Sequence, residues 1–183
     1  MKNTILNKKE KQVIHISKIE TPLGEMCVCA VEEGICLLGF TDRNRLEVEL
    51  ETLAKTLNAD VLQNDNEHIA LLKKQLIEYF EGKREVFSIP LFTTGTEFQQ
   101  LVWKELQNIP FGSTRSYKEQ AISIGNLNAV RAVAHANSMN RISIIIPCHR
   151  VIGQDGALKG YSGGLSRKKW LLDFENLNLF NMK

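Results

Sequence analysis

The stretch SYKEQAISIGNLNAVRAVAHANSMN, residues 116–140, decides the fold of the second half of the chain. Ser116 and Glu119 have the spacing of a capping box, which predicts the start of a short helix. Gly125 ends that helix, and residues 126–128 lead into a second helix of about two to three turns. Two short helices joined by a glycine-containing turn predict a helix-turn-helix, although such pairs also occur as plain packing units.

The second of these helices has little side-chain bulk. Its segment AVRAVAHAN, residues 129–137, is rich in alanine, and Arg131 is its only charged side chain. Small residues let a helix backbone approach a groove wall closely, and one long cation then reaches further than its neighbours. The alternative is a closely packed helix with Arg131 in solvent.

The segment IIIPCHRVIG, residues 144–153, follows directly. Its isoleucines predict a buried strand that ends in Cys148 and His149, and a nearby imidazole lowers the pKa of a thiol. Neighbouring side chains of a strand point to opposite faces, so a working pair requires a break at Pro147 and a bridging water. We expect Glu175, in the terminal helix SRKKWLLDFE, to orient the imidazole. The alternative is that Cys148 is a small apolar core residue.

The first half of the chain has an α+β pattern. The runs QVIHISKI, EMCVCAV and ICLLGF are separated by the turn-like TPLG and EEG, which predicts antiparallel strands. Apolar residues recur at helical spacing over residues 46–57 and 69–80, and Gly82 ends the second of these helices. We find no catalytic constellation in this half.

An extended connection separates the two halves. EVFSIPLFTTGT, residues 85–96, contains Pro90 and a Thr/Gly cluster, which do not favour a helix. Another amphipathic helix follows from Phe98 to Leu106. We therefore expect an N-terminal domain over residues 1–92 and a C-terminal domain over residues 93–183.

Composition and charge narrow the function classes. The chain has 183 residues, of which 43% are hydrophobic and 24% charged, as in globular proteins. Residues 1–95 carry 12 Lys and Arg against 15 Asp and Glu, whereas residues 96–183 carry 11 against 6. The basic second half favours a polyanionic partner, because Lys and Arg displace counterions from phosphates, although a solvated face has the same count.

The cysteines and the apolar segments indicate the compartment. No apolar segment follows the basic N-terminus, and the longest apolar stretch, residues 142–146, is too short to span a bilayer. We therefore expect a cytoplasmic protein without a membrane anchor, in which the cysteines need no bridge. Cys27 and Cys29 point to one face of a predicted strand, which favours a core role. The alternative is a zinc site without recognisable ligand spacing, formed by Cys27, Cys29, Cys36, His15 and His68.

The block from Thr96 to Glu175 resembles the O6-alkylguanine-DNA alkyltransferases, also called methylated-DNA–protein-cysteine methyltransferases. PCHRV matches the family's signature around its acceptor cysteine, and SY, RAV, GYSGGL and the WLL-x-x-E ending stand in the expected order and spacing. The stretch TPLGEMCVCAVEEGICLLGF is similar, more loosely, to the family's ribonuclease-H-like domain. The resemblance implies an α+β fold: an N-terminal ribonuclease-H-like antiparallel sheet with helices, then a mostly helical domain with a helix-turn-helix.

The resemblance also implies a reaction. A DNA repair protein of this kind moves a methyl or other alkyl group from O6-alkylguanine, and from O4-alkylthymine, irreversibly to Cys148, after the damaged base flips through the minor groove. His149 would draw the thiol proton through a water, and Glu175 would orient His149. Asn140 would brace the turn that carries the thiol. Tyr117 would hydrogen-bond the flipped guanine and crowd the target phosphate.

The implied DNA contacts and substrate pocket come from further positions. Arg131 would fill the space left by the extruded nucleotide, and Ala132 lies beside it on the same helix. Gln99 and Asn126 stand at other DNA-contact positions of the family. The implied substrate pocket consists of Val151, Tyr161, Ser162, Lys168 and Ser143.

Three positions depart from the family pattern. Ala134 stands where glycine is frequent, Arg141 follows Asn140 where proline is common, and Ser143 replaces a proline of the pocket wall. From these changes we expect a phosphate contact by Arg141 and an altered tolerance for bulky alkyl groups at Ser143. None of them removes a catalytic group, so they concern substrate range.

The resemblance implies no cofactor and no metal, and its partner is double-stranded DNA that contains O6-alkylguanine. One chain holds the whole implied site, so we expect a monomer with no obligatory protein partner.

Two other function classes remain open. A lesion-binding module would recognise DNA without chemistry, and a thiol hydrolase using Cys148, His149 and Glu175 would turn over without DNA.

Overall fold

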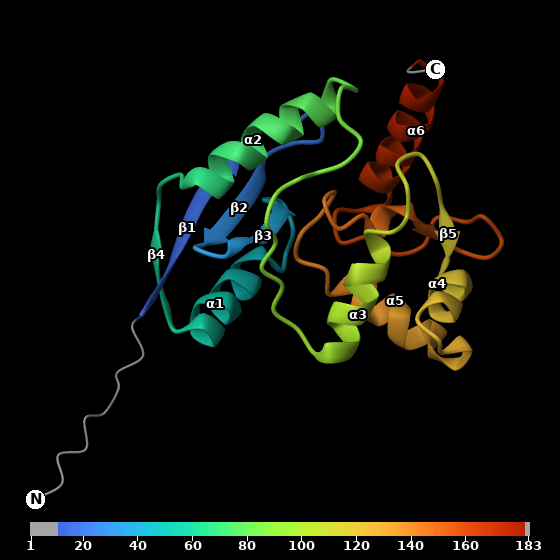
Figure 1. Cartoon of the computed structure of the whole chain (residues 1–183), viewed down its shortest axis with the longest axis horizontal. Coiled ribbons are helices and arrows are strands. Elements are labelled where there is room, and N and C mark those ends of the chain that lie inside the picture. Colours follow the sequence, from blue (N-terminus) through green and yellow to red (C-terminus); the bar gives the residue numbers. More distant parts are fainter. Residues whose placement is uncertain (1–10, 182–183) are drawn as a thin grey trace, which may run out of the picture.

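The structure is a computed structural model that describes residues 11–181. Its N-terminal part is a four-stranded sheet with a helix on each face (Figure 1). The first three strands pair antiparallel, as predicted, while the fourth pairs in parallel with the first and was not predicted. The fourth strand, ADVL, is short and mostly exposed, so no alternating pattern marks it. The strands, in spatial order, are β3 (Gly34–Phe40), β2 (Met26–Val31), β1 (Gln12–Ile19) and β4 (Ala59–Leu62).

Both predicted helices of this half are present, as α1 (Leu46–Leu57) and α2 (Glu67–Phe80). They cover opposite faces of the sheet. Successive side chains of β2 point alternately to these two faces, so they contribute to two separate apolar clusters, one under each helix. Leu53 of α1 packs in the cluster that holds three cysteines, and Leu72 of α2 packs in the larger cluster. All six residues of β2 are buried, so this strand is the centre of the N-terminal part.

The predicted extended connection joins this sheet to the helical part. Residues 81–96 form no helix, and they are fastened to β3 by backbone hydrogen bonds from Ile35 N to Pro90 O (2.9 Å) and from Phe92 N to Ile35 O (2.8 Å). Thr96 and Gln99 then form a capping box that starts α3 (Glu97–Leu106). The helix α3 therefore begins directly after a segment that is hydrogen-bonded to the edge of the sheet.

The predicted pair of short helices is present as α4 (Tyr117–Ser123) and α5 (Val130–Ser138). The capping box of Ser116 and Glu119 is confirmed, and Gly125 has a φ of +77°, which a side chain would disfavour. The buried amides of Gln120 and Asn137 bond reciprocally across the pair, at 2.7 and 3.3 Å. The remaining elements are β5 (Arg115–Ser116), η1 (Leu127–Ala129), η2 (Cys148–Arg150), β6 (Val151–Ile152) and α6 (Leu165–Asn181).

The isoleucine run before the reactive cysteine is not a strand, contrary to the prediction. It is a series of turns whose backbone pairs with the sheet at an isolated bridge between Ile142 and Leu38, and Ile144 has a positive φ of 71°. The side chain of Asn140 supplies the reason: it accepts a hydrogen bond from Ile142 N (2.9 Å) and donates to Ile146 O (2.8 Å), so it replaces strand partners. The isoleucines are core residues of a buried turn.

Candidate active site

The turn from Asn140 to Cys148, called the acceptor turn below, carries the candidate nucleophile. Cys148 opens the short helix η2 and is 5% exposed. The Asn140 amide Nδ2 lies 3.3 Å from its sulfur. Burial raises the pKa of the Cys148 thiol, while the Asn140 hydrogen bond and the Lys168 charge oppose that rise. The free protein therefore holds a protonated thiol among groups that favour its thiolate.

His149 is buried beside this thiol in the chain, with one nitrogen engaged and one not. Its Nε2 lies 2.9 Å from Glu175 Oε1, and its Nδ1 has no hydrogen-bond partner among the described residues. Because Glu175 can only accept when ionised, Nε2 carries the hydrogen and Nδ1 is the basic nitrogen. Burial lowers the pKa of His149, and the Glu175 charge works against that shift. The imidazole is thus oriented to accept a proton at Nδ1.

Glu175 is fully buried on α6 and accepts five hydrogen bonds. Its Oε1 receives Tyr79 Oη (2.8 Å), His149 Nε2 (2.9 Å) and Arg150 Nη2 (3.0 Å). Its Oε2 receives Arg150 Nε (2.9 Å) and Gly112 N (3.1 Å). Burial alone would raise its pKa, but His149 and Arg150 hold that pKa well below the usual range. Glu175 is therefore an anion at neutral pH although it is fully buried.

Sequence reasoning missed three of these donors. Arg150 follows the Cys-His pair directly, and an arginine inside a buried apolar segment was the available signal. It also donates to Ile109 O at 2.7 Å. Tyr79 and the backbone of Gly112 left no signal, because they lie far from Glu175 in the sequence.

Two of the predicted pocket residues, Lys168 and Val151, are joined by a hydrogen bond. The ammonium of Lys168 donates to three backbone oxygens, those of Val151 (2.6 Å), Lys159 (2.7 Å) and Gly160 (3.1 Å). Burial lowers its pKa to about 8. Lys168 thereby joins β6 to the loop that follows it.

Aromatic rings line the same region. The Tyr117 hydroxyl donates to Lys159 O at 2.8 Å, and its ring centroid lies 5.9 Å from Lys168 Nζ. Tyr161 meets the His149 ring edge-on at 6.3 Å. Three buried hydroxyls have no partner in the described part of the chain, those of Ser143, Tyr161 and Ser162. Unpaired buried hydroxyls indicate room for a polar ligand or water.

The predicted DNA-contact residues do not join this cluster. Arg131 and Ala132 are exposed on α5, Gln99 engages its side chain in the cap of α3, and Asn126 caps η1 by accepting from Asn128 N at 3.2 Å. They lie on the surface of the helical part, and their contacts there are local.

Arg141 bonds to the connection through one nitrogen, and the phosphate contact expected of it stays a prediction. It is half-buried, and its Nη1 donates to Thr94 Oγ1 of the connection at 2.8 Å. Its carbonyl also accepts from Leu38 N of β3 at 2.9 Å. The residue that replaces the family's proline therefore fastens the acceptor turn to the rest of the fold.

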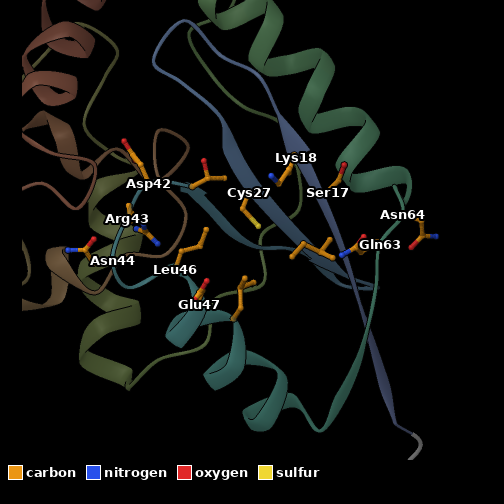
Figure 2. A pocket seen from close by; sticks show the side chains of 13 residues that line it. Ser17, Lys18, Cys27, Asp42, Arg43, Asn44, Leu46, Glu47, Gln63 and Asn64 are labelled. Atoms are coloured by element: carbon orange, nitrogen blue, oxygen red, sulfur yellow. The ribbon is translucent and has the colours of Figure 1, made fainter.

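A pocket also lies elsewhere in the molecule. It measures about 790 Å³ and is lined by residues of β1, β2, α1 and their loops, among them Lys18, Cys27 and Arg43 (Figure 2). A smaller pocket of about 340 Å³ lies against Tyr161 and Ser162. The second one adjoins the reactive cluster, whereas the first does not contain any of its residues.

The alternative of a zinc site finds no support within residues 11–181. No group of three or more His, Cys, Asp or Glu side chains there is arranged to hold a metal ion. Cys27, Cys29 and Cys36 are buried and free. In the same part of the chain, no helix has the length and apolar character needed to cross a membrane.

Known proteins confirm the resemblance. Family profiles described as the ribonuclease-like and DNA binding domains of 6-O-methylguanine DNA methyltransferase match residues 14–93 and 97–177. The methylated-DNA–protein-cysteine methyltransferase of Methanosarcina barkeri is 45% identical over 88% of this chain and 96% of its own. The constitutive one of Bacillus subtilis is 41% identical over 87% and 93%.

A solved structure agrees with the sequence matches. Mycobacterium tuberculosis OGT in complex with DNA superposes with a TM-score of 0.77 at 36% identity, covering 91% of this chain and 94% of that one. Both domain profiles, full-length relatives and the fold lead to one conclusion: the chain belongs to the 6-O-methylguanine DNA methyltransferase family.

Proposed function

We propose that the chain repairs DNA by transferring a methyl or other alkyl group from O6-alkylguanine to Cys148, irreversibly and once per polypeptide. The observation that carries the proposal is the buried series Cys148, His149 and Glu175, with a free Nδ1 at its centre, in a member of this family. A bond forms between Cys148 Sγ and the alkyl carbon while the bond from that carbon to guanine O6 breaks. The thioether has no route back to a thiol.

Proton transfer precedes the displacement in this proposal. His149 Nδ1 takes the Cys148 proton through a water, and the Glu175 anion stabilises the resulting imidazolium. Asn140 Nδ2 donates to the sulfur and so supports the thiolate. The cluster thereby supplies a base and a donor for the nucleophile.

The leaving guanine gains charge as the bond to O6 breaks. Tyr117 is the proposed donor to it, and its hydroxyl must then exchange its bond to Lys159 O for one to the base. The Ser162 backbone N–H would meet O6, and the carbonyls of Cys148 and Val151 would read the exocyclic amine. Lys168 holds that Val151 carbonyl in place.

The base must leave the duplex to reach Cys148, because the thiol is buried. We place α5 in the minor groove, where Arg131 fills the space of the flipped nucleotide. Gln99 and Asn126 would contact the DNA backbone, by atoms that their caps leave free. Such contacts carry little base information, so little sequence preference follows.

One chain holds the complete cluster, which supports a monomer acting without a protein partner or cofactor. The partner is double-stranded DNA that contains O6-alkylguanine, with O4-alkylthymine as a further substrate. The proposed place of action is the cytoplasm, where a reducing environment keeps the acceptor thiol free.

Peptide mapping tests the proposal. The protein is incubated with duplex DNA that carries one O6-methylguanine, and we expect one added methyl on the Cys148 peptide with stoichiometric loss of the lesion. Cys148→Ser must bind the lesion without transfer. Intact protein that leaves Cys148 unmethylated sinks the proposal; lesion binding without methylation indicates a binding module, and turnover of an acyl substrate without DNA indicates a hydrolase.

Parallel duplexes with O6-benzylguanine and O4-methylthymine test substrate range. We expect transfer from both, and the benzyl duplex also tests whether Ser143 leaves room for a bulky group. Rates relative to O6-methylguanine rank the three lesions.

A further inference from the structure

Tyr79 makes a contact that the proposed reaction does not use. It lies on α2, within residues 14–93 that match the ribonuclease-like domain, whereas the other donors to Glu175 lie within residues 97–177. Its side chain is fully buried, and its hydroxyl donates to Glu175 Oε1 at 2.8 Å. The N-terminal half thus touches the series that ends at Cys148.

The phenol is fixed as a donor. Burial first, and then the Glu175 charge, raise the pKa of Tyr79 well above its usual value, so the hydroxyl keeps its proton. Its ring is held by Phe80, Phe87 and Phe174, with centroids 5.2 to 5.4 Å away. The Tyr79 hydroxyl is therefore always the donor to Glu175, and the packed ring fixes where the hydroxyl lies.

Tyr79 and His149 compete for the same oxygen. Both bond to Glu175 Oε1, together with Arg150 Nη2. Each donor draws part of the carboxylate charge, and the charge left over sets how strongly Glu175 stabilises an imidazolium at His149.

The position of Glu175 does not depend on Tyr79. Arg150 bonds both carboxylate oxygens, and Gly112 N bonds Oε2. Removal of the phenol hydroxyl therefore changes the charge at Oε1 and leaves the carboxylate held from three directions. The other titratable or charged groups that act on Tyr79, His149 and Glu175 are Arg150, Lys168 and Tyr161.

We propose that Tyr79 is a positioning residue through which the N-terminal half sets the base strength of His149, and hence the pH at which Cys148 gives up its proton. It touches neither the substrate nor the thiol and acts through Glu175. The role in repair rests on the proposed function, whereas the effect of Tyr79 on the titration of His149 can be measured without it.

Tyr79→Phe isolates the hydroxyl and keeps the ring. With one donor fewer, Oε1 is more negative and stabilises the imidazolium more, so His149 stays protonated, and unable to accept the Cys148 proton, up to a higher pH. We expect the acid limb of the single-turnover transfer rate to move up by about half a pH unit. His149, followed by ¹H–¹⁵N NMR in the free protein, should titrate at a correspondingly higher pH.

Gln75→Met is the matched control on the same helix. The buried Gln75 exchanges hydrogen bonds with Ser88, at 3.0 and 2.9 Å, and has no bond to Glu175. This variant loses a buried polar pair, so it should lose stability and keep both pH midpoints. A Tyr79 role in packing alone predicts the same result for Tyr79→Phe.

Site-specific replacement of Tyr79 by 3,5-difluorotyrosine provides the opposite change, because the more acidic phenol is a stronger donor. It should move the acid limb downward, and it keeps the test available should Tyr79→Phe fold poorly. Unchanged midpoints, or shifts of the opposite sign, overturn the inference. Absence of transfer by the unaltered protein at every pH contradicts the proposed function instead, and the His149 titration then still decides the role of Tyr79.

Discussion

The sheet thiols and the acceptor thiol are buried to a similar degree, yet their surroundings differ. Cys27, Cys29 and Cys36 lie in an apolar cluster beneath α1, where burial raises the pKa of Cys36 to about 12. Cys148 is as hidden, but Asn140 donates to its sulfur and Lys168 adds a positive charge nearby. The Asn140 donor and the Lys168 charge, rather than exposure, therefore distinguish Cys148 from the equally buried Cys36.

The two regions also differ in how they are held. The sheet thiols sit on paired strands, whose ladders bond most of the backbone despite an irregularity between Cys29 and Ala30. Cys148 follows a turn whose carbonyls bond to the Asn140 side chain, and its neighbour His149 depends on an anion from α6. The acceptor region is thus built from side-chain contacts, which single substitutions can remove.

Glu175→Gln is the most damaging test of this difference. A glutamine cannot stabilise the imidazolium, so we expect single-turnover transfer to fall by about 10³- to 10⁴-fold, similar to the loss when the orienting carboxylate of a catalytic triad is replaced. The change also leaves Arg150 buried without its counter-charge, which lowers the free energy of unfolding by about 3–5 kcal/mol. Transfer within tenfold of the unaltered rate, measured on folded protein, would remove Glu175 from the mechanism.

The pH dependence of stability gives a second measure of Glu175. Its pKa is lowered by folding, from about 4.3 in an unfolded chain, so its contribution is complete above that value and is lost as the pH falls. Urea unfolding between pH 7 and pH 3 should therefore show a steeper loss in the unaltered protein than in Glu175→Gln. Parallel losses in the two proteins contradict a buried anion at this position.

Asn140→Ala should make Cys148 resemble the sheet thiols. The hydrogen bond from the Asn140 amide lowers the pKa of the Cys148 thiol, so its removal raises that pKa. Transfer at pH 7 should therefore fall about tenfold or more and recover as the pH rises. Asn137→Ala is the control, because it breaks the buried amide pair between α4 and α5 without touching the sulfur. A loss that does not recover at high pH would mean that the turn itself has collapsed.

Cys29→Ala and Cys36→Ala should have the smallest effects. Both side chains are buried in the cluster beneath α1, so we expect the free energy of unfolding to fall by about 1–2 kcal/mol. Transfer by folded protein should stay within about twofold, since neither thiol takes part in the reaction. A larger loss of transfer in either variant would break the distinction between the two regions.

The fold was predictable where the signal is local. Three strands, both helices of the first half and the capping box at Ser116 follow from spacing and end signals, and the structure confirms them. The isoleucine run was misassigned, because apolar periodicity cannot register that Asn140 replaces the partners of a strand. The strand β4 was missed because it has too few residues to show a pattern.

By itself, the sequence determined the family, through PCHRV and the motifs around it, and with it the candidate thiol, imidazole and carboxylate. Only the tertiary structure decided which groups surround the carboxylate: Tyr79 and Gly112 reach Glu175 from positions 96 and 63 residues away. It also decided that Arg141 joins the acceptor turn to Thr94 of the connection. The reason is physical: caps and periodicity act between neighbours in the chain, whereas the field around a buried charge is set by whatever the packed fold places against it.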